Sequence, residues 1–295
     1  MNKNFLLAFI GGSGLYQIED LKNKKWINVT TPWGPPSDKI LTGVINNNKV
    51  LFLPRHGRFH TLNPSEINYR ANIYALKKLG TTDIISLSAC GSLKENLSPG
   101  TFVLIDQFID KTILRKKTFF GDGIVAHVPM ANPTSISIRN ACAEVLRKLK
   151  IKYKNKGTYI AIEGPQFSTK AESENYRKQK IDVIGMTNMP EAKLAREAEI
   201  RYATVAMVTD YDCWHSKHDE VDVDKIIKTL NKNSNNAKSL VKNVINLIPK
   251  YLNKEKDDTE NILDKSIITQ EKDWDNKTKR KLDIILKRYL KKNES

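Results

Sequence analysis

Residues 5–14, FLLAFIGGSG, combine an apolar run with a turn made of three glycines and Ser13. The apolar part is about as long as one β-strand and much too short to cross a membrane. Glycine lets the backbone turn tightly and point N–H groups at an anion, while Ser13 offers a hydroxyl donor. The stretch predicts a buried strand followed by an anion-binding turn. An ordinary tight turn is the alternative, because the full GxGxxG and GK[ST] patterns are absent.

Short apolar runs that end in turn residues recur up to about residue 248, with longer amphipathic stretches between them. This alternation indicates an α/β domain in which helices cover a largely parallel or mixed sheet. Strands are expected at residues 6–10, 50–53, 83–89, 101–109, 158–162, 183–186 and 201–209. Helices are expected at residues 66–79, 134–149, 169–179, 191–198 and 223–248.

The composition shifts to Lys, Asp, Glu and Asn after Tyr251. We therefore divide the chain into a main domain, residues 1–251, and a lysine-rich C-terminal extension, residues 252–295, that is either disordered or loosely docked. Five apolar residues of the extension fall at helical spacing on one face: Leu282, Ile285, Leu286, Tyr289 and Leu290. We expect a C-terminal helix that docks on the domain. An arm for nucleic acid or a membrane surface is the alternative.

The 295 residues are 40% hydrophobic, which is typical of a globular protein that buries a sizeable core. A formal charge of +16 suits nucleic acid, a membrane surface or a phosphate-bearing substrate and does not decide among them. Three cysteines without a CxxC pair make a disulfide framework or a metal cluster improbable. Because residues 5–14 also lack the cleavage pattern of a signal peptide, we expect a cytoplasmic protein.

Two further turns carry polar groups at strand ends, where open α/β sheets bind ligands. The sequence PRHGR, residues 54–58, presents the planar fork of Arg55 beside His56, a pair that suits an oxyanion. A solvated basic turn is the alternative. In TDYDCW, residues 209–214, Asp210 and Asp212 lie two apart, so extended backbone would point both at one ligand. A helix cap or a loop salt bridge is the alternative there.

Three small-residue turns complete the pattern: SACGS at residues 88–92, EGPQFS at 163–168 and GMT at 185–187. The first closes an apolar strand. The second presents the ring of Phe167, which either packs in the core or stacks on a planar ligand.

Taken together, these segments resemble the purine nucleoside phosphorylase superfamily and, within it, the methylthioadenosine phosphorylases. The phrases that carry the resemblance, in order along residues 5–250, are FIGGSGLY, PRHGR, SACGSL to PGTFVLIDQFID, HVPMANP, IEGPQFSTKAES, VIGMTNMPEAKLAREA and VTDYDCW. The resemblance implies a mixed central β-sheet flanked by helices. It also implies that phosphate, as co-substrate, splits 5′-methylthioadenosine into adenine and 5-methylthioribose 1-phosphate. Neither a cofactor nor a metal is expected.

By the same resemblance, phosphate would contact residues that supply hydroxyls, cations and backbone N–H groups: Ser13, Arg55, His56, Ser88, Ala89 and Thr187. Phe167 would lie against the purine and Met186 against the sugar. Asp210 would be the catalytic acid at purine N7, because an anionic adenine is a poor leaving group. Asp212 would accept a hydrogen bond from the 6-amino group and so favour adenine over a 6-oxopurine.

The resemblance also implies a small apolar pocket for the 5′-methylthio group, formed by Val223 and Ile226 with Ser168 nearby. His127 would reach this pocket across a subunit interface, so a trimer or a pair of trimers is expected, without nucleic acid or membrane as a partner. Gln166 stands where eukaryotic relatives have arginine, and Gly185 where they have asparagine. Alternatives are a phosphorylase of methylthioinosine or of purine nucleosides broadly and, outside enzymes, a basic nucleic-acid-binding protein.

Overall fold

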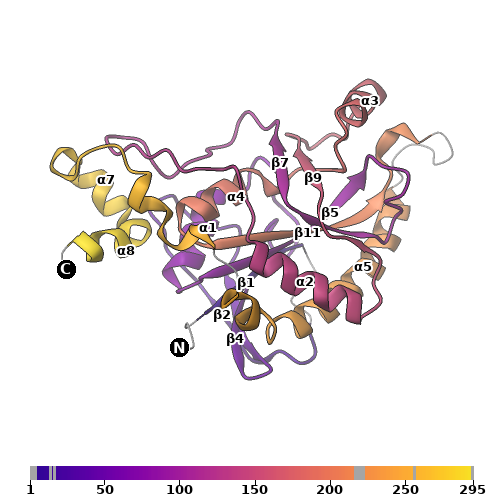
Figure 1. The fold of residues 1–295 in the computed structure, drawn as a ribbon, viewed down its shortest axis with the longest axis horizontal. Coiled ribbons are helices and arrows are strands. Elements are labelled where there is room, and N and C mark those ends of the chain that lie inside the picture. The colour runs from indigo at the N-terminus through magenta and orange to yellow at the C-terminus, as the bar shows by residue number, and fades with distance from the viewer. Residues whose placement is uncertain (1–4, 13–14, 16–17, 216–222, 255–256, 294–295) are drawn as a thin grey trace.

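The computed structural model describes residues 5–12, 15, 18–215, 223–254 and 257–293. Within this part of the chain, eleven strands form one mixed sheet with helices on both faces (Figure 1). This arrangement confirms the predicted α/β class. The strands are β1 Leu7–Gly11, β2 Lys22–Ile27, β3 Ile40–Ile45, β4 Asn48–Pro54, β5 Asp83–Ser92, β6 Phe102–Ile105, β7 Gln107–Asp110, β8 Tyr153–Lys154, β9 Thr158–Ala161, β10 Val183–Gly185 and β11 Arg201–Asp210.

Local sequence explains where several helices begin. Asn68 caps α1 by accepting a hydrogen bond from the N–H of Ala71, and Thr169 and Glu172 form a capping box at the start of α3. None of the described helices combines the length and the apolar character needed to cross a membrane. The helices are α1 Tyr69–Lys78, α2 Ile136–Lys148, α3 Lys170–Lys178, α4 Asn188–Glu197, α5 Val223–Val244, α6 Ile248–Leu252, α7 Asn276–Lys281 and α8 Asp283–Asn293, with 3₁₀ turns at Asp212–Trp214, Asp258–Lys265 and Glu271–Asp273.

The centre of the sheet is a parallel group in which β1 lies between β4 and β5, and β5 pairs on its other side with β11. All five residues of β1 are buried, because helices cover both faces of the sheet at this point. The carboxyl ends of these parallel strands lie at one edge, which is where the sequence places its polar turns.

Alternate residues of the strands divide between two hydrophobic cores. Ala8 and Ile10 pack on the side of α1, α4 and the C-terminal helices, whereas Leu7 and Phe9 pack on the side of α2, α5 and α6. The sheet is therefore the middle layer of three (Figure 1). Such a layer holds the strand ends in fixed positions.

Three expectations about secondary structure need correction. The single strand expected at residues 101–109 is two strands, because β6 pairs with β11 while β7 pairs with β9. Strands β2, β3 and β8 were not predicted. The expected helix at residues 223–248 ends at Val244, and a separate short helix, α6, follows from Ile248.

The C-terminal extension is docked on the body and not disordered in residues 257–293. Leu263, Leu282 and Leu286 are fully buried in the same core as α1 and α4. The extension also pairs with a distant loop, because Ala126 and Ile267 form an antiparallel bridge and the N–H of Ile268 donates to the carbonyl of Val125. Figure 1 shows α7 and α8 together at one end of the molecule, beside α1 and α4.

Candidate active site

A cavity of about 1070 Å³ opens at the sheet edge where β4, β5 and β11 end, and α5 covers part of it. This volume suits a small organic molecule together with an anion. Ten of the site residues expected from the sequence line it: Arg55, His56, Ser88, Ala89, Phe167, Ser168, Met186, Thr187, Asp210 and Asp212. Ser13 and the side chains of Val223 and Ile226 lie outside the described residues.

Arg55 follows β4 directly and is held from behind by Glu191 of α4. The guanidinium donates from Nε to Oε2 at 2.8 Å and from Nη2 to Oε1 at 3.0 Å, which is a two-point ion pair. Both side chains are 2% exposed. Burial by itself lowers the pKa of Arg55, but the contacts with Glu191 outweigh it, so the pKa lies above its ordinary value. Arg55 is therefore a permanently charged donor in a fixed orientation.

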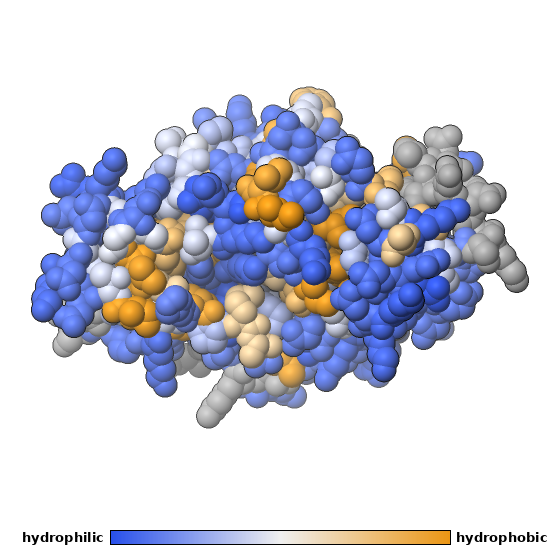
Figure 2. Space-filling model, turned by 90° about the horizontal axis from the view of Figure 1, so that it is seen from above, coloured by the Kyte–Doolittle hydropathy of each residue, from blue (hydrophilic) through white to orange (hydrophobic). Residues whose placement is uncertain are grey.

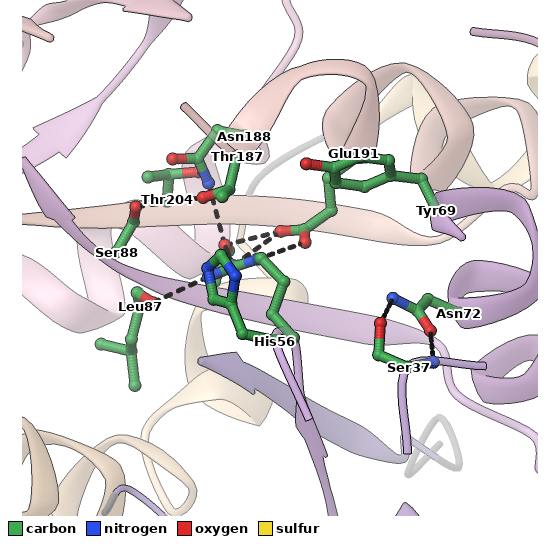
Figure 3. A network of polar contacts seen from close by, with 12 residues as sticks. Ser37, His56, Tyr69, Asn72, Leu87, Ser88, Thr187, Asn188, Glu191 and Thr204 are labelled. Atoms are coloured by element: carbon green, nitrogen blue, oxygen red, sulfur yellow. Dashed lines mark hydrogen bonds and ion pairs between the residues drawn. The ribbon is translucent and has the colours of Figure 1, made fainter. Parts of the chain in front are cut away.

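Hydrogen bonds from β5 and β11 also satisfy the carboxylate of Glu191. Its Oε1 accepts from the hydroxyls of Ser86 at 2.7 Å and Tyr202 at 2.8 Å. Asn188 donates to both of these hydroxyl oxygens in turn. Figure 3 shows Glu191 pointing from α4 into this network, with Ser88 and Thr187 on the other side of it. A buried charge pair with this many partners is rigid.

His56 is a neutral neighbour of this cation. Burial lowers the pKa of its imidazole to about 4, and the charge of Arg55 adds to the effect. Its Nδ1 lies 2.8 Å from the carbonyl oxygen of Leu62. Since a carbonyl can only accept, Nδ1 carries the proton, and Nε2 is left as an acceptor. The ring stacks on His60 with 4.4 Å between centroids.

Two hydroxyls meet beside Arg55. The Oγ atom of Ser88, in β5, lies 3.4 Å from the Oγ1 atom of Thr187, which precedes α4. The Thr187 side chain makes no capping hydrogen bond to that helix, so its hydroxyl is available to a ligand. Together with Arg55, these groups form a subsite in which hydrogen-bond donors converge, as an oxyanion requires.

Asp210 and Asp212 line the same cavity where β11 ends. Asp210 accepts hydrogen bonds from the hydroxyl of Thr209 at 2.7 Å and from the N–H of Asp212 at 2.8 Å. Burial raises the pKa of Asp210. The close approach of the pair to β5 depends on Gly91, since a Cβ there would lie 3.0 Å from Oδ1 of Asp210.

Asp212 carries an acceptor that no described group satisfies. Its Oδ2 atom is buried without a hydrogen-bond partner. Burial raises the pKa of Asp212 to about 6, and the charge of Asp210 adds to this effect, although the Ser173 hydroxyl lowers the pKa. A buried acceptor in the wall of a cavity is stabilised by a ligand that offers an N–H group.

The remaining walls are mostly apolar. Phe167 is 53% exposed and Met186 packs closely on Gly164, whose missing side chain leaves room for the sulfur. Ile227 and Leu230 of α5 line the cavity opposite them. Sequence analysis did not name these two residues, although they continue the apolar face that begins at Val223.

In a single chain, His127 does not line this cavity. Its N–H donates to the carbonyl of Ser266, and its side chain lines a smaller cavity of about 390 Å³ with Lys117, Lys193 and Glu197. The C-terminal extension therefore fixes the backbone of the residue that the resemblance assigns to a neighbouring subunit's site.

Two buried charges that position the site were not found from the sequence. Glu191 is the partner of Arg55. Arg115 is 7% exposed and donates to the carbonyls of Met186, Met189 and Glu163, which holds the segment around Thr187 in place. Both lie within segments rich in charged residues, where nothing local distinguishes a buried charge from a solvated one.

Comparison with known proteins adds evidence from sequence. The family model described as the phosphorylase superfamily matches residues 6–246. An S-methyl-5′-thioadenosine phosphorylase of Rhodospirillum rubrum is 57% identical over 237 residues, which cover 80% of this chain and 81% of the relative. One of Cereibacter sphaeroides is 50% identical over 290 residues, covering 97% of this chain and 99% of the relative. The match thus includes the C-terminal extension, which the sequence motifs alone had left outside it.

Solved structures that resemble this chain are also methylthioadenosine phosphorylases. A methylthioadenosine phosphorylase sourced from an antarctic soil metagenomic library has a TM-score of 0.91 and 48% identity, covering 96% of this chain and all of that one. The methylthioadenosine phosphorylase of Schistosoma mansoni, solved in complex with adenine, has a TM-score of 0.80 and 37% identity, covering 84% of this chain and 93% of that one.

Proposed function

The chain belongs to the phosphorylase superfamily and to its S-methyl-5′-thioadenosine phosphorylases, and from this we propose that its cavity binds 5′-methylthioadenosine and inorganic phosphate and catalyses cleavage of the nucleoside by phosphate. The products are adenine and 5-methylthioribose 1-phosphate. One observation carries the assignment of the site: a fixed cation with hydroxyl donors and a buried carboxyl pair line a single cavity. The first suits phosphate, and the second suits the edge of a purine.

At the anion end, Arg55 and the hydroxyls of Ser88 and Thr187 hold phosphate. Because Glu191 fixes the guanidinium before any ligand arrives, binding needs little reorganisation. His56, with Nδ1 protonated and Nε2 free, accepts a hydrogen bond from a phosphate O–H group. Phosphate is the co-substrate, and the reaction as proposed requires no further cofactor.

At the purine end, Asp210 donates a proton to N7 while the bond between C1′ and N9 breaks and phosphate oxygen bonds to C1′. The proton prevents negative charge from building up on adenine, which leaves as a neutral base. Burial raises the pKa of Asp210, so more of the carboxyl is protonated near neutral pH than in water.

The unpaired Oδ2 of Asp212 supports adenine as the base. A 6-amino group would donate to this oxygen, whereas a 6-oxo group would place two acceptors against each other. Phe167 provides the face for the purine and Met186 the contact for the sugar. Ile227 and Leu230 extend the apolar wall for the 5′-methylthio group.

We also propose a trimer or hexamer that acts in the cytoplasm, and exposed apolar side chains support the assembly. Phe59, Ile113 and Leu114 are each more than three quarters exposed. The upper face of the molecule carries several apolar areas between polar side chains (Figure 2). Large exposed apolar side chains are typical of surfaces that another subunit covers.

The assay that tests the function measures free adenine released from methylthioadenosine with and without phosphate. We expect release only with phosphate, and stoichiometric formation of the sugar phosphate. Asp210→Asn, which keeps the shape and removes the acid, should lower kcat by roughly 10²- to 10⁴-fold. Adenine release that is independent of phosphate would show hydrolysis and contradict the proposal.

A further inference from the structure

His60 lines the cavity, yet neither the sequence nor the proposed mechanism assigns it a role. It lies in the turn that follows Arg55, where its N–H donates to the carbonyl of Gly57 at 3.1 Å. Although the residue is exposed, its ring lies flat against another ring: it stacks on His56 with 4.4 Å between centroids and 12° between planes. The stack connects His60 to a residue of the anion subsite.

The backbone of His60 is in the left-handed region, with a φ of 53°. Side chains other than glycine enter this region at a cost, and such strain is concentrated at functional sites. The turn closes directly after it, because Thr61 and Leu62 both donate their N–H groups to the carbonyl of His56. The strained residue and the two that follow it therefore all contact His56.

His56 is the residue that this stack restrains. Its Nδ1 lies 2.8 Å from the carbonyl oxygen of Leu62, which fixes the tautomer but leaves the ring able to swing about that single contact. Burial lowers the pKa of His56 to about 4, so the ring is neutral near pH 7 and packs against a neighbouring ring without repulsion between like charges. Contact with His60 on one face restricts the swing and holds Nε2 in one direction.

We propose that His60 is a positioning residue for phosphate: its ring holds the plane of the His56 imidazole so that Nε2 faces the anion beside Arg55. This inference rests on the proposed phosphate subsite and adds to it a residue that acts through His56. An acceptor that is already oriented loses less freedom when its ligand binds. The stack therefore increases the affinity for phosphate and has little effect on the nucleoside.

Two variants separate the ring of His60 from its backbone. His60→Asn suits the left-handed backbone but has no ring, so its melting temperature should equal or exceed that of the wild type. Its dissociation constant for inorganic phosphate, measured by calorimetry, and its KM for phosphate should rise about 3- to 10-fold, as expected for the loss of one aromatic stack. The KM for methylthioadenosine should stay within twofold.

His60→Phe keeps a flat ring, removes the ring nitrogens and places a bulky residue on a strained backbone. It should melt at a lower temperature than the wild type and still bind phosphate within twofold of it. Phosphate affinity and melting temperature thus change in opposite orders in the two variants, whereas a merely structural role would make them change together.

His215→Asn is the matched control. His215 also stacks on an aromatic ring, that of Tyr211 at 4.6 Å, but it does not line the cavity, so its loss should leave phosphate affinity unchanged. The inference is wrong if His60→Asn keeps its phosphate affinity, if His60→Phe loses as much as His60→Asn, or if His215→Asn loses as much.

Calorimetry combined with the adenine assay distinguishes this outcome from failure of the proposed reaction. A wild-type protein that binds phosphate but releases no adenine contradicts the reaction, while weaker phosphate binding by His60→Asn would still support the inference. A wild-type protein that releases adenine with phosphate, beside a His60→Asn variant of unchanged phosphate affinity, overturns the inference alone.

Discussion

The Nε atom of Arg55 lies 2.8 Å from Oε2 of Glu191, and the two residues are 136 positions apart in the sequence. One comes from the end of β4 and the other from α4, so the ion pair joins the sheet to the helix layer. The charge of the guanidinium is balanced before phosphate arrives, and its orientation is set from the side opposite the cavity. Selectivity at this subsite therefore depends on hydrogen-bond geometry as well as on charge.

Glu191→Ala should lower the free energy of unfolding by about 3–5 kcal/mol, because it leaves the buried guanidinium without its counter-charge. The KM for phosphate should rise as well, since the fork of Arg55 loses the acceptor that orients it. Urea denaturation and steady-state kinetics measure the two effects.

Asp20→Ala is the control for this change. It breaks the pair of Lys242 and Asp20, whose side chains are 48% and 49% exposed, and should cost about 1 kcal/mol or less. Equal losses in the two variants would contradict the distinction between the buried and the exposed pair.

Asp212→Asn should reduce the preference for a 6-amino over a 6-oxo purine. An amide in place of the unpaired Oδ2 can donate to a 6-oxygen, so kcat/KM for methylthioadenosine relative to methylthioinosine should fall roughly 5- to 100-fold. The ratio is measured with both nucleosides at saturating phosphate. An unchanged ratio would remove Asp212 from base recognition.

Stability of the ligand-free protein should depend on pH through Asp212. Its pKa is raised from 3.8 to about 6, so the folded state favours the protonated form, and the stabilisation present below about pH 4 is lost as the pH rises through 6. The free energy of unfolding of the wild type minus that of Asp212→Asn should fall by about 2 kcal/mol between pH 4 and 7.

The comparison with the variant is necessary because Glu197, whose pKa burial raises to about 7, changes stability in the same direction. Denaturation curves of both proteins at four pH values provide the measurement. Parallel curves for the two proteins would show that Asp212 does not titrate as described.

Leu286→Ala should destabilise the protein by about 2–5 kcal/mol, because Leu286 is fully buried where α8 meets the core of α1 and α4. Lys287→Ala, one residue further on and exposed, should stay within about 0.5 kcal/mol of wild type. Thermal unfolding of both variants measures the difference. A loose tail would give two unchanged melting temperatures.

The sequence predicts the strands at the centre of the sheet, where most residues are buried. Strands β1, β4, β5 and β11 lie at the centre of the sheet and show as apolar runs. Strand β2, with the sequence KNKKWI, is an edge strand whose first four residues are exposed, so it has no apolar pattern to detect. The break between β6 and β7 at Asp106 depends on a distant contact, because its carboxylate accepts from the N–H of Gly157.

The same limit applies to the site. Arg55 and Asp210 stand next to strand ends, where turn residues and charge give a local signal. Glu191 and Arg115 give none, since their roles depend on groups that approach from other elements. The sequence shows only that residue 185 is a glycine. The structure shows why a side chain would not fit there, because a Cβ atom would clash with the ring and hydroxyl of Tyr159.

The bridge between Ala126 and Ile267, together with the burial of Leu263 and Leu286, also has a consequence for biosynthesis. Since translation runs from the N-terminus, these residues emerge after the sheet and the helices that they pack against. The core beside α1 and α4 consequently stays open to solvent until residues 257–293 have emerged and docked. During that interval a nascent chain of this enzyme exposes apolar side chains of α1 and α4 to chaperones and proteases.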